Sequence, residues 1–98
     1  MLNEMTIKAL EEKGFNRWQK GNYDRLYINA TTLGLDCTYY KTGNISGATW
    51  CDEHISNSMA YRLKAAKTYI DVKTGKLYSD HFWLKEKAQQ IVDEIMAA

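Results

Sequence analysis

Six glycines mark the places where the hydrophobic pattern of this 98-residue chain changes, so they limit the length of any helix or strand. Gly14 follows a segment with apolar residues at helical spacing, and Gly21 interrupts a segment in which apolar and polar residues alternate. Glycine adopts the left-handed backbone conformations that end helices and close tight turns. We therefore interpret the glycines at positions 14, 21, 34, 43, 47 and 75 as caps, turns or bends.

Three segments have the apolar periodicity of helices. The first covers residues 2–13. The second is expected to begin at Ser56 or Ser58 and the third at Ser79 or Asp80, because serine and aspartate are favoured N-cap residues. The expected buried faces comprise Ile55, Met59, Leu63 and Ala66 in the second helix, and Leu84, Ala88, Ile91, Val92 and Ile95 in the third.

Short alternating segments separated by turn residues predict strands. Six such segments form three pairs, at residues 15–20 and 23–29, 37–41 and 45–51, and 68–72 and 76–78. The prediction is an α+β fold in one domain of residues 1–98, with an antiparallel sheet of about six short strands packed by three helices. The expected order is α-β-β-β-β-α-β-β-α.

The tripeptide Lys-Thr-Gly occurs twice, at residues 41–43 and 73–75. The same tripeptide contributes to the active site of penicillin-recognising enzymes, which also need a Ser-x-x-Lys nucleophile motif. No serine in this chain has a lysine three residues later. A glycine that ends a hairpin loop explains both copies, so we interpret them as turns.

The chain has two cysteines and two histidines, and four such residues are the number that a tetrahedral zinc site uses. Only Cys51 and His54 have a plausible local spacing, and Cys37 and His81 would have to approach them through folding. A catalytic pair of Cys51 and His54 is a second alternative, in which Asp52 and Glu53 could serve as neighbouring carboxylates, although any polar loop offers such neighbours. The simpler interpretation is that the cysteines are small, buried, reduced side chains, and no metal or other cofactor is expected.

The composition is that of a globular domain, with 45% hydrophobic and 26% charged residues. The first ten residues lack the basic and apolar regions of a signal peptide, and no apolar run has the length of a membrane span. We therefore expect a cytoplasmic protein that does not insert into a membrane. Twelve aromatic residues are many for this length and suit either a core or a contact surface.

Positive charge is concentrated in two segments. Residues 13–25 contain four basic residues and one acidic residue, and residues 59–76 contain five basic residues and one acidic residue. Aromatic residues lie among them, and this combination is typical of surfaces that bind nucleic acids or nucleotides. The candidate binding residues are Arg17, Trp18, Lys20, Tyr23, Arg25, Arg62, Lys64, Lys67 and Lys73. A solvated basic face over an aromatic core layer explains the same pattern.

Four stretches, "RWQKGNYDRLYINATTLGL", "YYKTGNISGATW", "ISNSMAYRL" and "YIDVKTGKLY", resemble small hypothetical proteins of bacteriophages and other mobile elements. The resemblance implies a compact accessory protein. Inhibitors of host defence, including anti-CRISPR proteins, are often small proteins that act by binding.

Three hypotheses follow for function. The first is a non-enzymatic binding protein of phage or mobile-element type that occupies the surface of a host or phage protein. The alternative is direct binding of a nucleic acid or nucleotide on the basic and aromatic face. A cysteine- or zinc-dependent enzyme is a third possibility. A homodimer is also plausible, because a chain of this size gains core by self-association.

Overall fold

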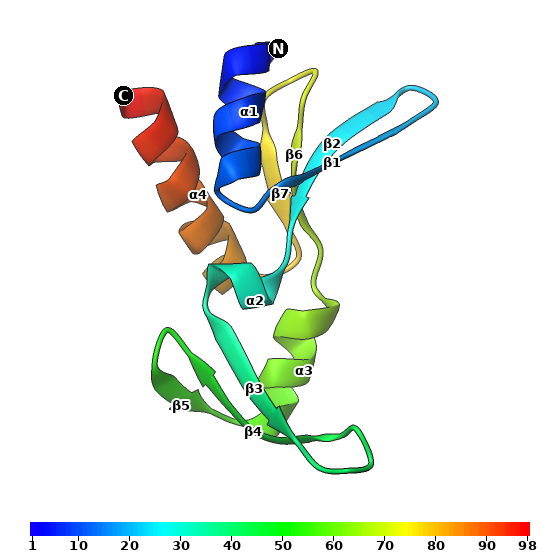
Figure 1. The fold of residues 1–98 in the computed structure, drawn as a ribbon, viewed down its shortest axis with the longest axis vertical. Helices are drawn as coiled ribbons and strands as arrows, with labels where there is room; N and C mark the ends of the chain where they lie inside the picture. The colour runs from blue at the N-terminus through cyan, green and yellow to red at the C-terminus, as the bar shows by residue number, and fades with distance from the viewer.

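The computed structural model describes all 98 residues and contains four helices and seven strands in two antiparallel sheets. The larger sheet has the strand order β1 (Asn16–Lys20), β2 (Tyr23–Ile28), β6 (Thr68–Asp71) and β7 (Leu77–Ser79). Helices α1 (Glu4–Glu12) and α4 (Phe82–Ala97) contact each other on one side of this sheet (Figure 1). We call these six elements the large-sheet half.

The smaller sheet has three strands, β3 (Leu35–Tyr39), β4 (Ile45–Trp50) and β5 (Glu53–Ile55). Helix α3 (Asn57–Ala65) packs on β3 and β4, and these four elements form the small-sheet half. The short helix α2 (Ala30–Leu33) lies where the halves meet and contacts α3, α4 and β3. The chain leaves the larger sheet at Ile28 and returns at its pairing partner Thr68, so the small-sheet half is an insertion between two neighbouring strands.

One hydrophobic cluster of 16 buried residues extends through both halves. Leu26 and Ile70 lie on the helix-facing side of the larger sheet, and Leu84 of α4 is fully buried with them. The indole rings of Trp50 and Trp83 stack with centroids 6.2 Å apart and join the smaller sheet to α4. The two halves therefore share a core.

The end of α1 is built as its sequence predicts. Gly14 has a φ of +110°. Its N–H donates to the carbonyl of Glu11 at 3.0 Å, and the N–H of Phe15 donates to the carbonyl of Leu10 at 3.2 Å. These are the two hydrogen bonds of a Schellman motif, so the predicted helix end is confirmed. The N-cap is Asn3, whose Oδ1 accepts the Thr6 N–H at 2.8 Å.

Both Lys-Thr-Gly copies lie in hairpin turns, as predicted. The first connects β3 to β4 and the second connects β6 to β7. Gly43 has a φ of +92° and Gly75 a φ of +75°. Each glycine therefore supplies the left-handed conformation that its turn requires.

The α+β class is confirmed, but the predicted single sheet of six strands and three helices is wrong. The predicted order lacks α2. The N-cap of this helix is Asn29, whose Oδ1 accepts the Thr32 N–H at 2.8 Å. The predicted order also lacks β5, which is joined to β4 by a two-residue turn at Cys51 and Asp52. These residues have φ values of +50° and +70°, where glycine or asparagine is usual, so the sequence carries no clear turn signal there.

The predicted start of the last helix is also wrong. Its N-cap is His81, because the two favoured candidates bond elsewhere. The Ser79 hydroxyl pairs with the Thr68 hydroxyl at 2.8 Å, and the Asp80 carboxylate accepts the Lys67 backbone N–H at 2.9 Å. At 16 residues α4 is the longest helix, and no helix combines the length and apolar character needed to cross a membrane.

Candidate functional site

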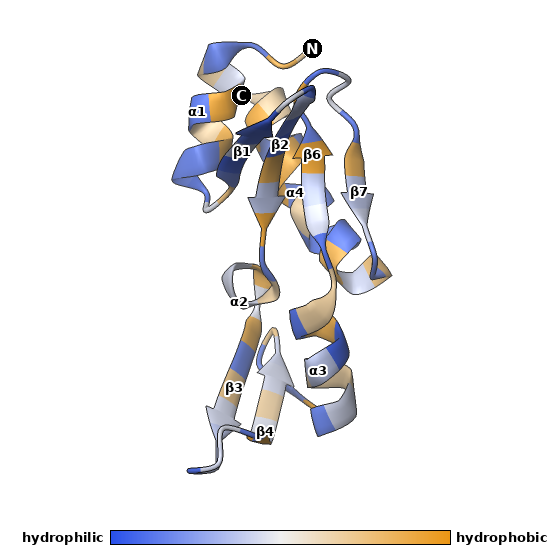
Figure 2. Cartoon of the chain, turned by 90° about the vertical axis from the view of Figure 1, so that its right-hand side faces the viewer, coloured by the Kyte–Doolittle hydropathy of each residue, from blue (hydrophilic) through white to orange (hydrophobic).

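The face of the larger sheet opposite α1 and α4 has no helix over it. Figure 2 shows strands of this sheet in front of α4. Alternation along β2 explains which side chains reach this open face: Leu26 and Ile28 point to the core and are buried, so Tyr23, Arg25 and Tyr27 point the other way. The open face is therefore the polar and aromatic side of a half-buried sheet.

Five aromatic rings form a continuous row across all four strands of this face. Trp18 lies 6.2 Å from Tyr23 and 6.2 Å from Tyr27, measured between ring centroids. Tyr27 lies 5.2 Å from Tyr69, which stacks on Tyr78 at 5.3 Å. We call these five residues the aromatic row. Three of its rings remain accessible, since Trp18 is 41%, Tyr23 57% and Tyr78 44% exposed.

A cation lies among these rings. The Arg25 guanidinium carbon is 4.6 Å from the centroid of the Tyr23 ring and 4.3 Å from that of Tyr69, and Nη1 donates to the Tyr27 hydroxyl at 3.0 Å. The pKa of Arg25 is raised above its ordinary value, chiefly by the hydrogen bond to Tyr27. Asp71 is the register partner of Arg25, yet the structure contains no ion pair between them. Arg25 therefore makes no ion pair within the protein.

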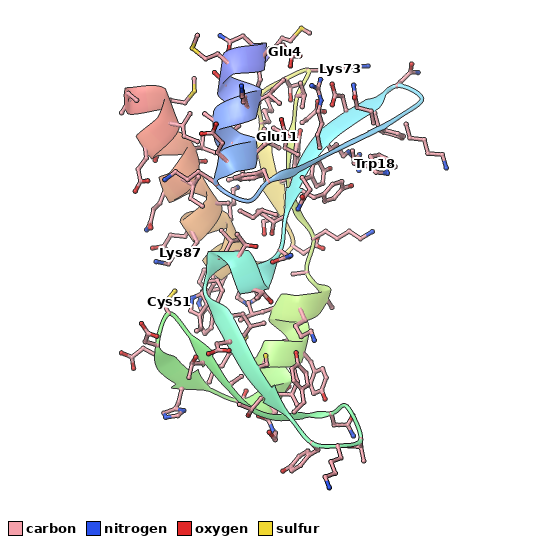
Figure 3. All side chains as sticks on the ribbon, in the orientation of Figure 1. Glu4, Glu11, Trp18, Cys51, Lys73 and Lys87 are labelled. Atoms are coloured by element: carbon pink, nitrogen blue, oxygen red, sulfur yellow. The ribbon has the colours of Figure 1, made fainter.

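A shallow hollow of about 560 Å³ lies at the end of the open face next to the β1–β2 turn. Its lining residues are Trp18, Lys20, Gly21, Asn22 and Tyr23. The Nζ of Lys73 donates to the Asn22 carbonyl at 2.6 Å, so the β6–β7 turn brings a second lysine to this corner. Figure 3 shows Trp18 below the β1–β2 hairpin and Lys73 above it, at the end of the β6–β7 turn. The hollow combines two exposed rings with nearby positive charge.

Arg17, one of the predicted binding residues, lies on the other side of the sheet. Its guanidinium contacts the Asp24 carboxylate at 2.8 Å and the Glu4 carboxylate of α1 at 3.4 Å. The hydrogen bond to Asp24 raises the pKa of Arg17, and the same bond holds the pKa of Asp24 below its usual range. Arg17 therefore joins α1 to the sheet and does not contribute to the open face.

The predicted basic residues around α3 are also separate from the aromatic row. Arg62 and Lys64 belong to α3 in the small-sheet half, where the Lys64 Nζ donates to the Tyr39 hydroxyl at 2.8 Å. Arg62 lines a different hollow, of about 450 Å³, with Asp80 and His81. Lys67 lies just before β6. Of the nine predicted residues, those gathered at the open face and its corner are Trp18, Lys20, Tyr23, Arg25 and Lys73.

Sequence reasoning did not assign Tyr78 to the site. It lies on β7, opposite Tyr69, and this pairing completes the aromatic row at the sheet edge. The alternation in the predicted strand at residues 76–78 was the available signal, because Leu77 faces the core side and Tyr78 must then face away from it.

The four candidate metal ligands are dispersed. Cys37 lies on β3, Cys51 in the β4–β5 turn, His54 on β5 and His81 at the N-cap of α4. The structure contains no group of three or more histidine, cysteine, aspartate or glutamate residues placed to hold a metal ion. The His81 Nδ1 instead accepts the Trp83 N–H at 3.1 Å. The structure does not assemble the zinc site considered from the sequence.

No protein-family model, curated protein or solved structure matches this chain.

Proposed function

We propose that this protein binds single-stranded nucleic acid on the open face of its larger sheet. The observation that carries the proposal is the aromatic row, a continuous series of five rings on a sheet face without a helix over it. Aromatic side chains stack on unpaired bases, and each stacked base contributes about 1–3 kcal/mol. Bases inside a duplex do not present their faces, so the row suits a single strand better than a double strand.

Positive charge beside the row supports the same ligand. Lys20 lines the hollow next to Trp18 and Tyr23, and Lys73 lies at the adjoining turn. Two phosphate contacts give a salt dependence with a slope of about −1.4 on a logarithmic plot for a single strand. Binding is therefore expected to weaken about sevenfold between roughly 50 and 200 mM salt.

A protein partner was the first hypothesis from the sequence, including inhibition of a host defence, and it stays a prediction. Tyrosine, tryptophan and arginine are also the residues enriched at protein interfaces. We favour nucleic acid for two reasons. Arg25 makes no ion pair with an acidic residue, and Lys20 and Lys73 add positive charge at one end of the row. These features fit a negatively charged polymer whose bases are exposed for stacking.

The test is fluorescence anisotropy with a labelled oligonucleotide of about 12 nucleotides, in single-stranded and duplex form. Trp18→Ala removes the ring that contacts both Tyr23 and Tyr27 and should weaken single-strand binding by about 5- to 150-fold. The matched control is Tyr40→Ala, because Tyr40 is a 61% exposed aromatic residue beyond the end of β3 in the small-sheet half. It should leave binding unchanged.

Absence of single-strand binding at low salt contradicts the proposal, and so does an equal loss in the Trp18→Ala and Tyr40→Ala variants. A different result supports the protein-partner hypothesis in its place. In that case the protein captures another protein even after nuclease treatment, loses this capture in Trp18→Ala, and binds no oligonucleotide.

A further inference from the structure

Arg25 retains hydrogen-bond donors that the protein does not use. A guanidinium has five N–H donors. In Arg25, Nε is buried without a partner and Nη1 uses one donor on the Tyr27 hydroxyl at 3.0 Å. Nη2 makes no hydrogen bond within the protein and, unlike Nε, is not a buried unpaired atom. Nη2 and the second donor of Nη1 are therefore left to an acceptor from outside.

The rings fix the position of these donors. The guanidinium carbon lies within 4.6 Å of the Tyr23 centroid and 4.3 Å of the Tyr69 centroid, while Tyr27 holds Nη1. Trp18 is the register partner of Arg25 on the neighbouring strand, and this residue is 41% exposed. A base stacked on Trp18 therefore has its edge beside an oriented guanidinium.

We propose that Arg25 makes this surface prefer guanine, by donating to the O6 and N7 acceptors of a guanine stacked on Trp18. The inference rests on the proposed binding of single-stranded nucleic acid and names the base that the surface selects. Arginine donates to both guanine acceptors at once, whereas adenine presents one acceptor and one donor on the same edge. Guanine is also a purine, so it covers more of the indole ring than a pyrimidine with two adjacent acceptors does.

A base edge suits the position of Arg25 better than a phosphate does. Arg25 lies between two rings of the aromatic row, and a phosphate there would lose water over apolar surface, which is costly for a charged group. Lys20 is exposed and lies at the end of the face, where a phosphate stays hydrated. The arrangement therefore assigns the phosphates to the lysines and the base edge to Arg25.

The test compares thymidine oligonucleotides that carry one central guanine, 7-deazaguanine, adenine or cytosine, with anisotropy as the readout. Wild-type protein should bind the guanine strand about 5- to 150-fold more tightly than the adenine strand, the factor expected for one bidentate contact. The 7-deazaguanine strand lacks N7, so it should lose most of this preference. This comparison uses only the wild-type protein and does not depend on any variant folding.

Arg25→Lys keeps the charge but removes the planar fork of donors. It should abolish the preference for guanine while the thymidine strand still binds. The matched control is Lys20→Ala, which removes a proposed phosphate contact and should weaken all strands by a similar factor. Circular dichroism spectra and thermal unfolding confirm that both variants are folded.

The outcomes separate the two proposals. If thymidine strands bind but guanine brings no gain, or if cytosine is preferred, the guanine inference is overturned and the proposed function stands. If the preference for guanine over adenine persists with 7-deazaguanine and in Arg25→Lys, the bidentate contact does not cause it and the role of Arg25 is overturned. If no single strand binds, the proposed function itself is overturned.

Discussion

Replacing Gly14 with alanine adds a methyl group where the end of α1 meets α2. Gly14 has a φ of +110°, which an L-residue adopts only with strain. The new Cβ would lie 2.5 Å from Cγ2 of Thr32, and the next nearest atoms, Cβ and Oγ1 of Thr32, would be at 3.7 and 3.8 Å. One methyl group of Thr32 therefore accounts for the whole overlap.

Two costs add in the Gly14→Ala variant. The backbone conformation costs about 1–3 kcal/mol. Forcing a methyl group into a packed contact costs about 1–3 kcal/mol more. The free energy of unfolding should therefore fall by about 2–6 kcal/mol, a large part of the 5–15 kcal/mol typical of a whole domain. The melting temperature should fall by at least about 8 °C for a chain of this size.

A double-mutant cycle separates the two costs by urea denaturation. Thr32→Ser removes Cγ2 but keeps the hydroxyl that donates to Asn29 Oδ1 at 3.0 Å, so it should restore about 1–3 kcal/mol in the Gly14→Ala background. The matched control is Gly43→Ala, because Gly43 has a φ of +92° and its added Cβ would meet no atom within 4 Å. Equal losses in Gly14→Ala and Gly43→Ala, with no rescue by Thr32→Ser, would refute the overlap.

Three further changes test local interactions by urea denaturation. Asp24→Asn removes the carboxylate that accepts from Arg17. The pKa of Asp24 is lowered in the folded state, so the ionised carboxylate stabilises the fold at pH 7, and this stabilisation is lost as the pH falls through that pKa. The stability difference between wild type and Asp24→Asn should therefore narrow from pH 7 to about pH 3, and a constant difference would contradict this. Ser56→Ala removes the N-cap of α3 and should cost about 1 kcal/mol, whereas Ser56→Asn should cost little. Tyr61→Phe leaves the Ile45 N–H without the hydroxyl that accepts it at 2.7 Å and should cost about 1–3 kcal/mol; an unchanged stability would show that water replaces the bond.

Local signals were enough to predict most of the elements. Glycine turns with alternating flanks predicted the β1–β2, β3–β4 and β6–β7 hairpins, and Gly14 predicted the end of α1. The β4–β5 hairpin was missed because its turn uses Cys51 and Asp52 with positive φ. The division into two sheets was missed because it depends on the pairing of β2 with β6, which no short-range pattern reports.

The candidate site was predicted in part, for a similar reason. Trp18 and Arg25 were both selected by composition, and pairing in the first hairpin places them opposite each other. Arg17 was selected by its charge alone, although alternation along β1 puts it on the face opposite Trp18. Arg62 and Lys64 are close to β6 in sequence but belong to a helix that packs on the other sheet. Side-chain direction was therefore predictable from local pattern, and the grouping of distant segments was not.

The insertion of the small-sheet half between β2 and β6 has a consequence for how the molecule folds. Thirty-nine residues separate Ile28 from its partner Thr68, whereas the β1–β2 turn needs only two. Closing the longer loop as an unstructured chain would cost about 2–3 kcal/mol more. The inserted segment brings its own ends together when it folds, so we expect it to form before the central strands of the larger sheet meet. The contact between Tyr27 and Tyr69 exists only after that step, so the surface proposed to hold the ligand is completed last.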